Sequence, residues 1–175
     1  MNKKIAEKIK KIKLLILDVD GILTNGEIIL DEKGREIKIF DVQDGFGIVL
    51  FQRAGFKTAI LSAKSAPAVT ARAKDLKIGK VCQNASPKIV AYKKILRHFK
   101  LTDAQACFMA DDLTDMEVLR KVGLSVTVPN AVNEVKRIAD YMTKREGGRG
   151  AVREVVELIL KAQNKWAGIL KAYVA

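Results

Sequence analysis

The stretch that decides the fold is Leu14-Leu15-Ile16-Leu17-Asp18-Val19-Asp20-Gly21-Ile22-Leu23-Thr24. Its first residues are uniformly apolar and give way abruptly to two carboxylates. A short apolar run that ends in polar residues and glycine predicts a strand buried on both faces, as in a parallel sheet. Ligands of open α/β sheets bind just beyond the carboxyl ends of such strands, which is where Asp18 and Asp20 fall.

The two carboxylates are one residue apart, so strand alternation places Asp18 and Asp20 on the same side of the chain. At about 4 Å and an effective dielectric constant of about 20, their repulsion costs on the order of 4 kcal/mol unless a cation or a proton intervenes. We therefore expect the pair to have a use. The tetrapeptide alone is equally compatible with a solvated turn that does no chemistry.

The composition bounds the class of protein. With 175 residues, 49% of them apolar and 30% charged, residues 1–175 are expected to form one globular domain. No apolar run approaches the roughly 18 residues of a membrane-spanning helix, and the lysine-rich start is not a secretory signal. Cys82 and Cys107 have no disulfide or metal-site spacing, which favours a cytoplasmic location.

The net charge of +12 raises the question of nucleic acid as a partner. The lysines are spread over nearly every predicted helix, and the few aromatic residues do not interleave with them. We therefore expect a solvated exterior that steers a small anionic substrate, with neither nucleic acid nor membrane as a partner. The only histidine, His98, is expected on a helix surface.

Strands and helices alternate along the chain. We predict buried strands at 14–19, 58–61, 80–82, 106–110 and 124–128, and helices at 45–54, 66–77, 87–98, 113–122, 131–138 and from 151 onward. This alternation indicates right-handed βαβ units, and hence an α/β fold with a Rossmann-like, mainly parallel sheet and helices on both faces. Two β-prone runs, 27–30 and 35–40, flank a polar turn that ends in Gly34, which predicts a protruding hairpin after the first strand.

Polar groups stand at three further strand ends. Ser62 follows the second buried strand, where a hydroxyl and free N–H groups can hold a phosphate oxygen. Lys88 lies in the first turn of a helix, where a positive charge interacts unfavourably with the helix dipole. This position indicates that the lysine faces an anion. A surface lysine without a function is an equal alternative. Asp111 and Asp112 follow the fourth strand, and Asp115 lies one turn later. For Asp115 especially, the alternative is a purely structural role, in which the acid stabilises the helix N-terminus. This set describes a phosphate and Mg²⁺ site rather than a zinc site, because it contains only hard oxygen donors.

The motifs resemble those of the haloacid dehalogenase-like phosphatases. The resemblance is carried by Asp18-Val19-Asp20-Gly21 with Thr24, by Ser62, by Lys88, and by Asp111-Asp112 with Asp115. Within that superfamily, most of the chain is similar to the capless 3-deoxy-D-manno-octulosonate 8-phosphate phosphatases. The markers are Asp41-x-x-Asp44-Gly45-x-Gly47, the hairpin, and Gly147-Gly148-x-Gly150-Ala151-Val152-Arg153-Glu154. The family usually has Thr-Gly-Arg, Gly and Arg where this chain has Ser62-Ala63-Lys64, Ala110 and Val49.

The resemblance implies a Mg²⁺-dependent hydrolase of a sugar-acid phosphate, belonging to lipopolysaccharide biosynthesis. Asp18 would attack phosphorus and become an aspartyl phosphate, while Asp20 would protonate the leaving oxygen and then deprotonate water. Asp18, the Asp20 carbonyl and Asp111 would hold Mg²⁺, and Ser62 and Lys88 would neutralise the phosphoryl oxygens. The implied substrate-binding positions are Asp20, Asp41, Val42, Gln43, Asp44, Gly45, Lys64, Arg72 and Lys88, with Thr24, Asp112 and Asp115 in support.

The resemblance also implies an assembly without a cap domain. A hairpin flap at about 26–41 would pack in a homotetramer, so that neighbouring subunits close each site. The C-terminal helix and tail would occupy about residues 150–175. The segment from Gly147, including Arg149 and Arg153, would lie near a site, its own or a neighbour's, and help to hold the anionic substrate. Two alternatives stay open: a phosphatase of 2-keto-3-deoxynononate 9-phosphate, and a non-catalytic basic binding protein on the same scaffold.

Overall fold

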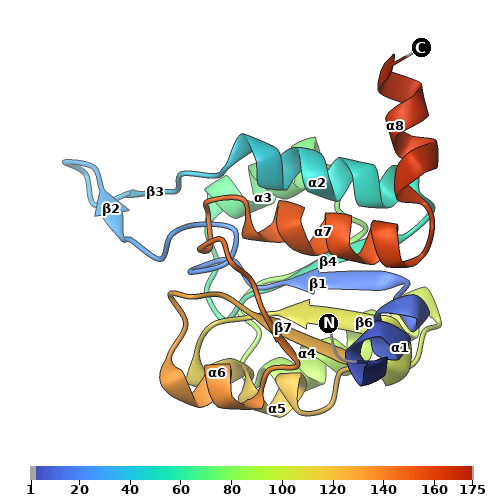
Figure 1. Cartoon of the computed structure of the whole chain (residues 1–175). Helices are drawn as coiled ribbons and strands as arrows, with labels where there is room; N and C mark the ends of the chain where they lie inside the picture. Colours follow the sequence, from blue (N-terminus) through green and yellow to red (C-terminus); the bar gives the residue numbers. More distant parts are fainter. Residues whose placement is uncertain (1–2, 175) are drawn as a thin grey trace.

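The computed structural model describes residues 3–174 and builds them around one parallel sheet (Figure 1). Its strands are β1 (Leu14–Leu17), β4 (Lys57–Leu61), β5 (Lys80–Cys82), β6 (Ala106–Met109), β7 (Leu124–Thr127) and β8 (Tyr141–Met142). They lie in the order β5-β4-β1-β6-β7-β8, and every neighbouring pair is parallel. The predicted α/β fold with a parallel sheet is confirmed.

Helices cover both faces of the sheet (Figure 1). One layer contains α2 (Val42–Arg53), α3 (Pro67–Asp75) and α7 (Ala151–Ala162); the other contains α4 (Lys88–Phe99), α5 (Met116–Leu119) and α6 (Asn133–Ile138). The N-terminal α1 (Lys3–Lys11) packs against α7, and α8 (Trp166–Val174) projects from the body. Two short 3₁₀ helices, η1 (Asp103–Gln105) and η2 (Leu113–Asp115), precede β6 and α5.

The central position of β1 explains its uniformly apolar sequence. All its residues are fully buried between β4, β6 and the two helical layers. Leu17, its last residue, pairs with Ile60 of β4 and with Met109 of β6. The chains leaving these three strands therefore emerge side by side at one edge, as expected for parallel neighbours. They carry the polar residues identified from the sequence.

The segment between β1 and β4 differs in detail from the prediction. In the hairpin, only β2 (Ile29–Leu30) and β3 (Glu36–Ile37) pair. Helix α2 begins at Val42 rather than at residue 45, because the Asp41 carboxylate accepts hydrogen bonds from the backbone N–H groups of Gln43 and Asp44 and so caps the helix. The hairpin therefore protrudes as a narrow flap (Figure 1).

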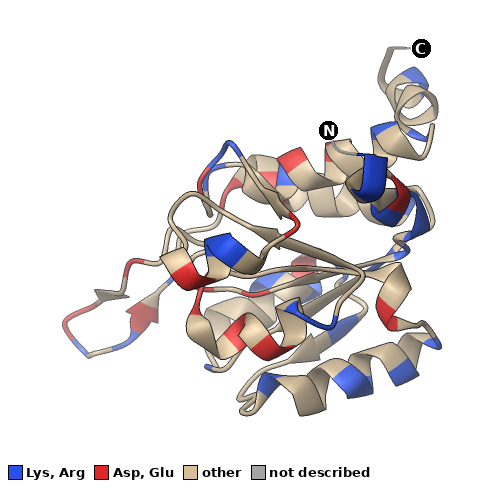
Figure 2. Ribbon diagram, turned by 60° about the horizontal axis from the view of Figure 1, so that its bottom comes forward, with Lys and Arg blue, Asp and Glu red and all other residues tan. Residues whose placement is uncertain are grey.

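Charged residues are spread over many elements of the fold. Figure 2 shows Lys and Arg spread over several helices and loops, with Asp and Glu among them. His98 is exposed on α4, as predicted. Within residues 3–174, none of the helices combines the length and the apolar character that a bilayer crossing requires.

Candidate active site

A cavity of about 300 Å³ lies beyond the carboxyl ends of β1, β4 and β6. It brings together polar residues from all four sequence motifs. Its lining consists of Asp18, Asp20, Gly21, Gly26, Ser62, Ala63, Lys64, Lys88, Asp111, Asp112 and Thr114. A larger hollow of about 650 Å³ opens elsewhere, beside α7, but two of its basic residues, Arg153 and Lys161, are already paired with Glu157. We therefore take the smaller cavity, which gathers residues of all four motifs, as the candidate active site.

Lys88, the first residue of α4, is buried in this cavity and carries its positive charge between two carboxylates. Its Nζ donates to Asp18 Oδ2 at 2.8 Å and to Asp115 Oδ1 at 2.6 Å. Burial pulls the pKa of Lys88 down, but Asp18 and Asp115 outweigh it and hold the pKa above its usual range. The lysine thus faces anions, which accounts for its unusual place in a first helical turn.

Asp18 is the innermost carboxylate on the β1 loop. Its Oδ1 accepts a hydrogen bond of 2.7 Å from the Val19 backbone N–H, and its Oδ2 accepts from Lys88. Burial raises the pKa of Asp18 above the ordinary carboxyl range, against the opposing pull of the Lys88 ammonium. A second positive charge in the cavity would help to keep Asp18 ionised.

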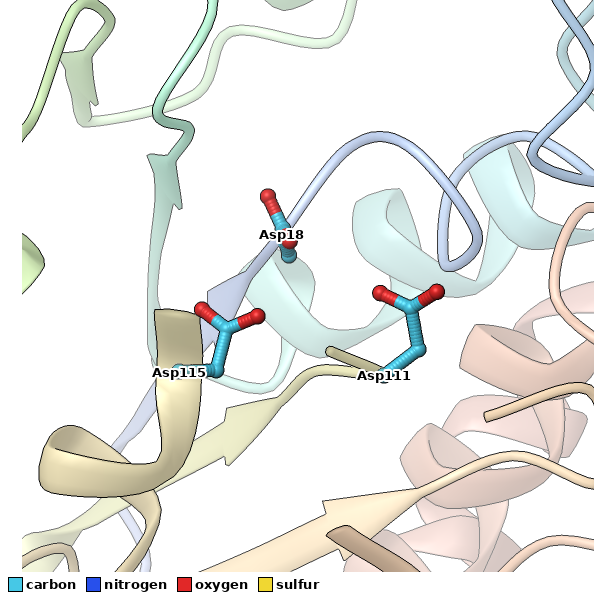
Figure 3. Close-up of side chains that lie close together, drawn as sticks. All are labelled: Asp18, Asp111 and Asp115. Atoms are coloured by element: carbon cyan, nitrogen blue, oxygen red, sulfur yellow. The ribbon is translucent and has the colours of Figure 1, made fainter. Parts of the chain in front are cut away.

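Asp111 and Asp115 complete an acidic group with Asp18 (Figure 3). One carboxylate oxygen from each residue lies within 4.8 Å of the others. Among the described residues, Asp115 Oδ2 is buried without a hydrogen-bond partner. Burial, followed by repulsion from Asp18, raises the pKa of Asp111 and that of Asp115 to about 7.

These observations fit a hard divalent cation. The donors are carboxylate oxygens, as Mg²⁺ prefers, and a bound cation would offset both the burial and the mutual repulsion that raise the pKa values of Asp111 and Asp115. The resemblance implies Asp18, the Asp20 backbone carbonyl and Asp111 as the metal ligands. In the structure, the side chains of Asp18 and Asp111 are grouped with that of Asp115, while the Asp20 side chain lines the cavity outside that group. The role of the Asp20 carbonyl as a ligand stays a prediction.

The loop after β1 is shaped by Gly21. Its φ is +79°, which favours glycine, and a Cβ there would lie 2.0 Å from Asp111 Oδ2 and would displace that carboxylate. The Thr24 hydroxyl supports this loop by accepting from the Gly21 and Gly26 backbone N–H groups at 3.4 and 3.3 Å. Thr24 thus braces the loop that carries Asp20, and its supporting role in the reaction stays a prediction.

The Gly147 segment packs directly on this loop. A Cβ on Gly147 would lie 1.7 Å from the Gly21 carbonyl oxygen. Asn130, which the sequence analysis missed, joins the two segments: its Nδ2 donates to Gly21 O at 3.0 Å, and its Oδ1 accepts from Gly147 N at 2.9 Å. Arg149 is exposed beside this contact, whereas Arg153 bonds Glu157 on α7 and does not line the cavity.

Other predicted site residues divide into two groups. Ser62, Lys64 and Asp112 line the cavity; the Ser62 hydroxyl also accepts from the Lys64 backbone N–H, and Asp112 caps η2. The second group lies outside the lining and surrounds the start of α2: Asp41, Val42, Gln43, Asp44, Gly45 and Arg72.

Some of the residues around the start of α2 make structural contacts, and their role in substrate binding stays a prediction. Asp44 is buried and accepts from the backbone N–H groups of Gly150 and Arg153, which fixes the start of α7. Gly45 gives room to Arg72, whose Nη2 would lie 2.2 Å from a Cβ at that position. Burial raises the pKa of Asp44 to about 6, although those N–H groups lower it.

The departures from the family pattern cause no visible disruption. Ala110 is fully buried, and its carbonyl oxygen accepts from Thr127 Oγ1 at 2.8 Å. Val49 packs partly buried against the core on α2. Lys64 keeps a positive charge at the edge of the cavity.

Asp111→Asn should stabilise the metal-free protein at pH 8. A carboxyl whose pKa is raised to about 7 on folding costs stability once ionised; the cost grows from about pH 4 and is complete above pH 7. We expect a gain of roughly 2 kcal/mol, which allows for partial solvation of this side chain. Thermal unfolding in chelator at pH 8 and at pH 4 measures the gain and its disappearance.

Mg²⁺ should reverse the order of the two proteins. The cation stabilises the wild type by binding the folded state, and Asp111→Asn should lose most of that stabilisation. Glu117→Gln, at an exposed position of α5, serves as the control. An Asp111→Asn protein that was less stable than the wild type in chelator at pH 8 would contradict the electrostatic account.

Comparison with known proteins places this chain in a family. The family model described as haloacid dehalogenase-like hydrolase matches residues 51–155. The chain is 41% identical over 158 residues to 3-deoxy-D-manno-octulosonate 8-phosphate phosphatase KdsC of Escherichia coli K12, covering 90% of this chain and 84% of that protein. It is 40% identical over 164 residues to KdsC of Yersinia pestis, covering 94% and 88%.

Solved structures agree. The structure of 3-deoxy-D-manno-octulosonate 8-phosphate phosphatase from Moraxella catarrhalis, in complex with magnesium, phosphate and KDO, has a TM-score of 0.95 at 38% identity and covers 99% of both chains. The cobalt-bound enzyme from Haemophilus influenzae has a TM-score of 0.87 at 35% identity, covering 90% of this chain and 92% of that chain. With the family match, the sequence identity and the shared fold all in agreement, the chain belongs to the haloacid dehalogenase-like hydrolases.

Proposed function

We propose that this chain is a Mg²⁺-dependent phosphatase that hydrolyses 3-deoxy-D-manno-octulosonate 8-phosphate through an aspartyl phosphate on Asp18. The observation that carries the proposal is the cluster of Asp18, Lys88, Asp111 and Asp115 at the edge of the sheet. The relatives and the solved structures that bear this activity in their names cover nearly the whole chain. The intact cluster disfavours a non-catalytic binding protein.

In the first half of the reaction, an Asp18 oxygen forms a bond to phosphorus while the bond from phosphorus to the sugar oxygen breaks. Asp20 gives its proton to that leaving oxygen. Lys88 and Ser62 face the phosphoryl oxygens and offset their charge. Bound Mg²⁺, held by Asp18 and Asp111, would screen the carboxylate nucleophile from the phosphate dianion.

In the second half, Asp20, now a carboxylate, takes a proton from water as that water attacks the phosphorus of the aspartyl phosphate. The bond between Asp18 and phosphorus breaks, and inorganic phosphate leaves. Both halves need Asp20 near the phosphoryl group, and it lines the same cavity as Asp18. Lys64 at the edge of this cavity is available for a second anionic group of the substrate, such as a sugar-acid carboxylate.

A substrate panel tests this function. Purified protein is assayed with 3-deoxy-D-manno-octulosonate 8-phosphate, 2-keto-3-deoxynononate 9-phosphate and a simple hexose phosphate, each with Mg²⁺ and with chelator. We expect the highest kcat/KM with the eight-carbon substrate and no turnover in chelator. A higher kcat/KM with the nine-carbon substrate would replace the proposed substrate, and full activity in chelator would contradict the metal site.

We also propose that the chain assembles through its hairpin, residues 26–41, as a homotetramer. The flap protrudes from the body (Figure 1) and exposes 48–64% of each of four apolar residues, Ile28, Leu30, Ile37 and Ile39. A narrow hairpin with such a surface is marginal in water unless another chain covers it. The segments between the motifs are too short to supply a cap domain, so a neighbour would also close the cavity.

We also propose a cytoplasmic location, which is supported by the free thiols of Cys82 and Cys107.

Replacing Ile37 and Ile39 by Lys should dissociate the assembly. Two lysines in an apolar interface leave charges unpaired and buried, so we expect monomers and a large loss of kcat/KM. Light scattering gives the mass, and Lys33→Met at the exposed hairpin turn is the control. A wild-type protein that is monomeric and fully active at assay concentration would contradict the proposal.

A further inference from the structure

The side chain of Lys38 is buried at the base of the protruding hairpin. It is 3% exposed, although Lys38 directly follows β3 in a flap surrounded by solvent. The apolar residues on either side, Ile37 and Ile39, are 48% and 61% exposed. Because side chains alternate along an extended segment, this arrangement turns the lysine toward the domain and the isoleucines toward solvent. Such burial of a long cation requires strong partners.

Those partners are two carboxylates. Lys38 Nζ donates to Asp20 Oδ1 at 2.5 Å and to Glu36 Oε1 at 2.7 Å. Burial lowers the pKa of Lys38, but the hydrogen bonds and charges of Asp20 and Glu36 outweigh it and raise the pKa above the usual range. The charge of the Lys38 ammonium is therefore balanced by two carboxylates, and the Lys38–Asp20 ion pair connects the flap to the loop after β1.

The Asp20 side chain depends on this contact for its placement. It is 31% exposed, and among the described residues Lys38 is the one that bonds its carboxylate. Lys38 engages Oδ1 and leaves the second oxygen for the proton that moves to the leaving group. A general acid must lie within hydrogen-bond reach of its target, and a displacement of about 1 Å can cost about 100-fold in rate.

We propose that Lys38 is a positioning residue that fixes the Asp20 carboxyl for its two proton transfers. This inference rests on the proposed phosphatase function and adds a role for the hairpin beyond assembly. The outer face of the flap carries the apolar residues that a neighbouring chain would cover. Its inner face holds Asp20 through Lys38, so the same hairpin offers an interface on one face and places the acid–base group on the other.

The first test uses leaving groups that differ in their need for a proton. The variants are Lys38→Met, Lys38→Arg and the control Lys33→Met. Each protein, in excess over substrate and with Mg²⁺ present, is mixed with either the sugar phosphate or nitrophenyl phosphate. Release of the alcohol is then followed during a single turnover. For Lys38→Met we expect a loss of about 30- to 100-fold with the sugar phosphate and about 3-fold or less with nitrophenyl phosphate. Lys38→Arg, which keeps a charged donor, should recover most of the rate, and Lys33→Met should match the wild type.

A double-mutant cycle gives the second test. If Lys38 acts through Asp20, Lys38→Met should cause no further loss in an Asp20→Asn background. The proposal would be overturned if Lys38→Met lowered the rate equally with both substrates. It would also be overturned if Lys38→Met lowered the rate of Asp20→Asn by the same factor as it lowers the rate of the wild type. Should Lys38→Met fail to fold, as judged by circular dichroism, Lys38→Gln takes its place. Failure of the phosphatase function itself is distinguishable, because the wild type would then release neither alcohol.

Discussion

Asp18→Asn should lower the turnover of the sugar phosphate by roughly 10⁴-fold or more while leaving the fold intact. The amide has the size of the carboxylate but cannot form the acyl phosphate. Folding should survive because Lys88 keeps its bond to Asp115, and one charge is removed from a crowded acidic group. Initial rates of phosphate release and a thermal unfolding curve measure the two effects.

The control for Asp18→Asn is Glu117→Gln, which removes an exposed carboxylate outside the cavity. Its rate should equal that of the wild type. An Asp18→Asn protein with a rate near that of the wild type would end the proposed covalent mechanism, because Asp18 could then not be the nucleophile.

Asp20→Asn should lower the rate of the first chemical step by about 10²- to 10⁴-fold with the sugar phosphate. The alkoxide leaving group needs a proton, and the amide has none to give. With nitrophenyl phosphate the leaving group is stable without a proton, so we expect a much smaller loss. Single-turnover release of the alcohol, measured for both substrates, gives the comparison.

The contrast between leaving groups isolates the acid role of Asp20. An amide can still accept the hydrogen bond from Lys38 through its oxygen, so the flap should remain seated. Equal losses with the two substrates would show that Asp20 acts in some other way, for example by shaping the loop before Gly21.

Much of the fold could be predicted because β1 is buried on every side. A strand between two neighbouring strands and two helical layers has no exposed face, so its sequence shows no alternation of polar and apolar residues. The end of the apolar run at Asp18 marks the end of the strand. The gathering of Asp18, Ser62 and Asp111 follows from parallel strands that end at one edge. These inferences needed only local patterns and the rules of sheet topology.

Contacts between distant loops could not be predicted in the same way. Asp44 reads as a polar residue near a helix start, yet it accepts from the N-terminus of α7, more than a hundred residues later. Asn130 joins two glycine segments through both atoms of its amide, and nothing in its neighbourhood signals this. The alternation around Lys38 did carry a signal, since a lone cation between two isoleucines lies on the face opposite to them.

The most direct test of the covalent mechanism traps the intermediate. Asp20→Asn is mixed with nitrophenyl phosphate and Mg²⁺, quenched in acid within one turnover, and digested for peptide mass analysis. Without Asp20 to activate water, the aspartyl phosphate should accumulate, so we predict one phosphoryl group per chain on the peptide that contains Asp18. Nitrophenolate released with Asp18 left unmodified, or a phosphoryl group on any other residue, would contradict the account.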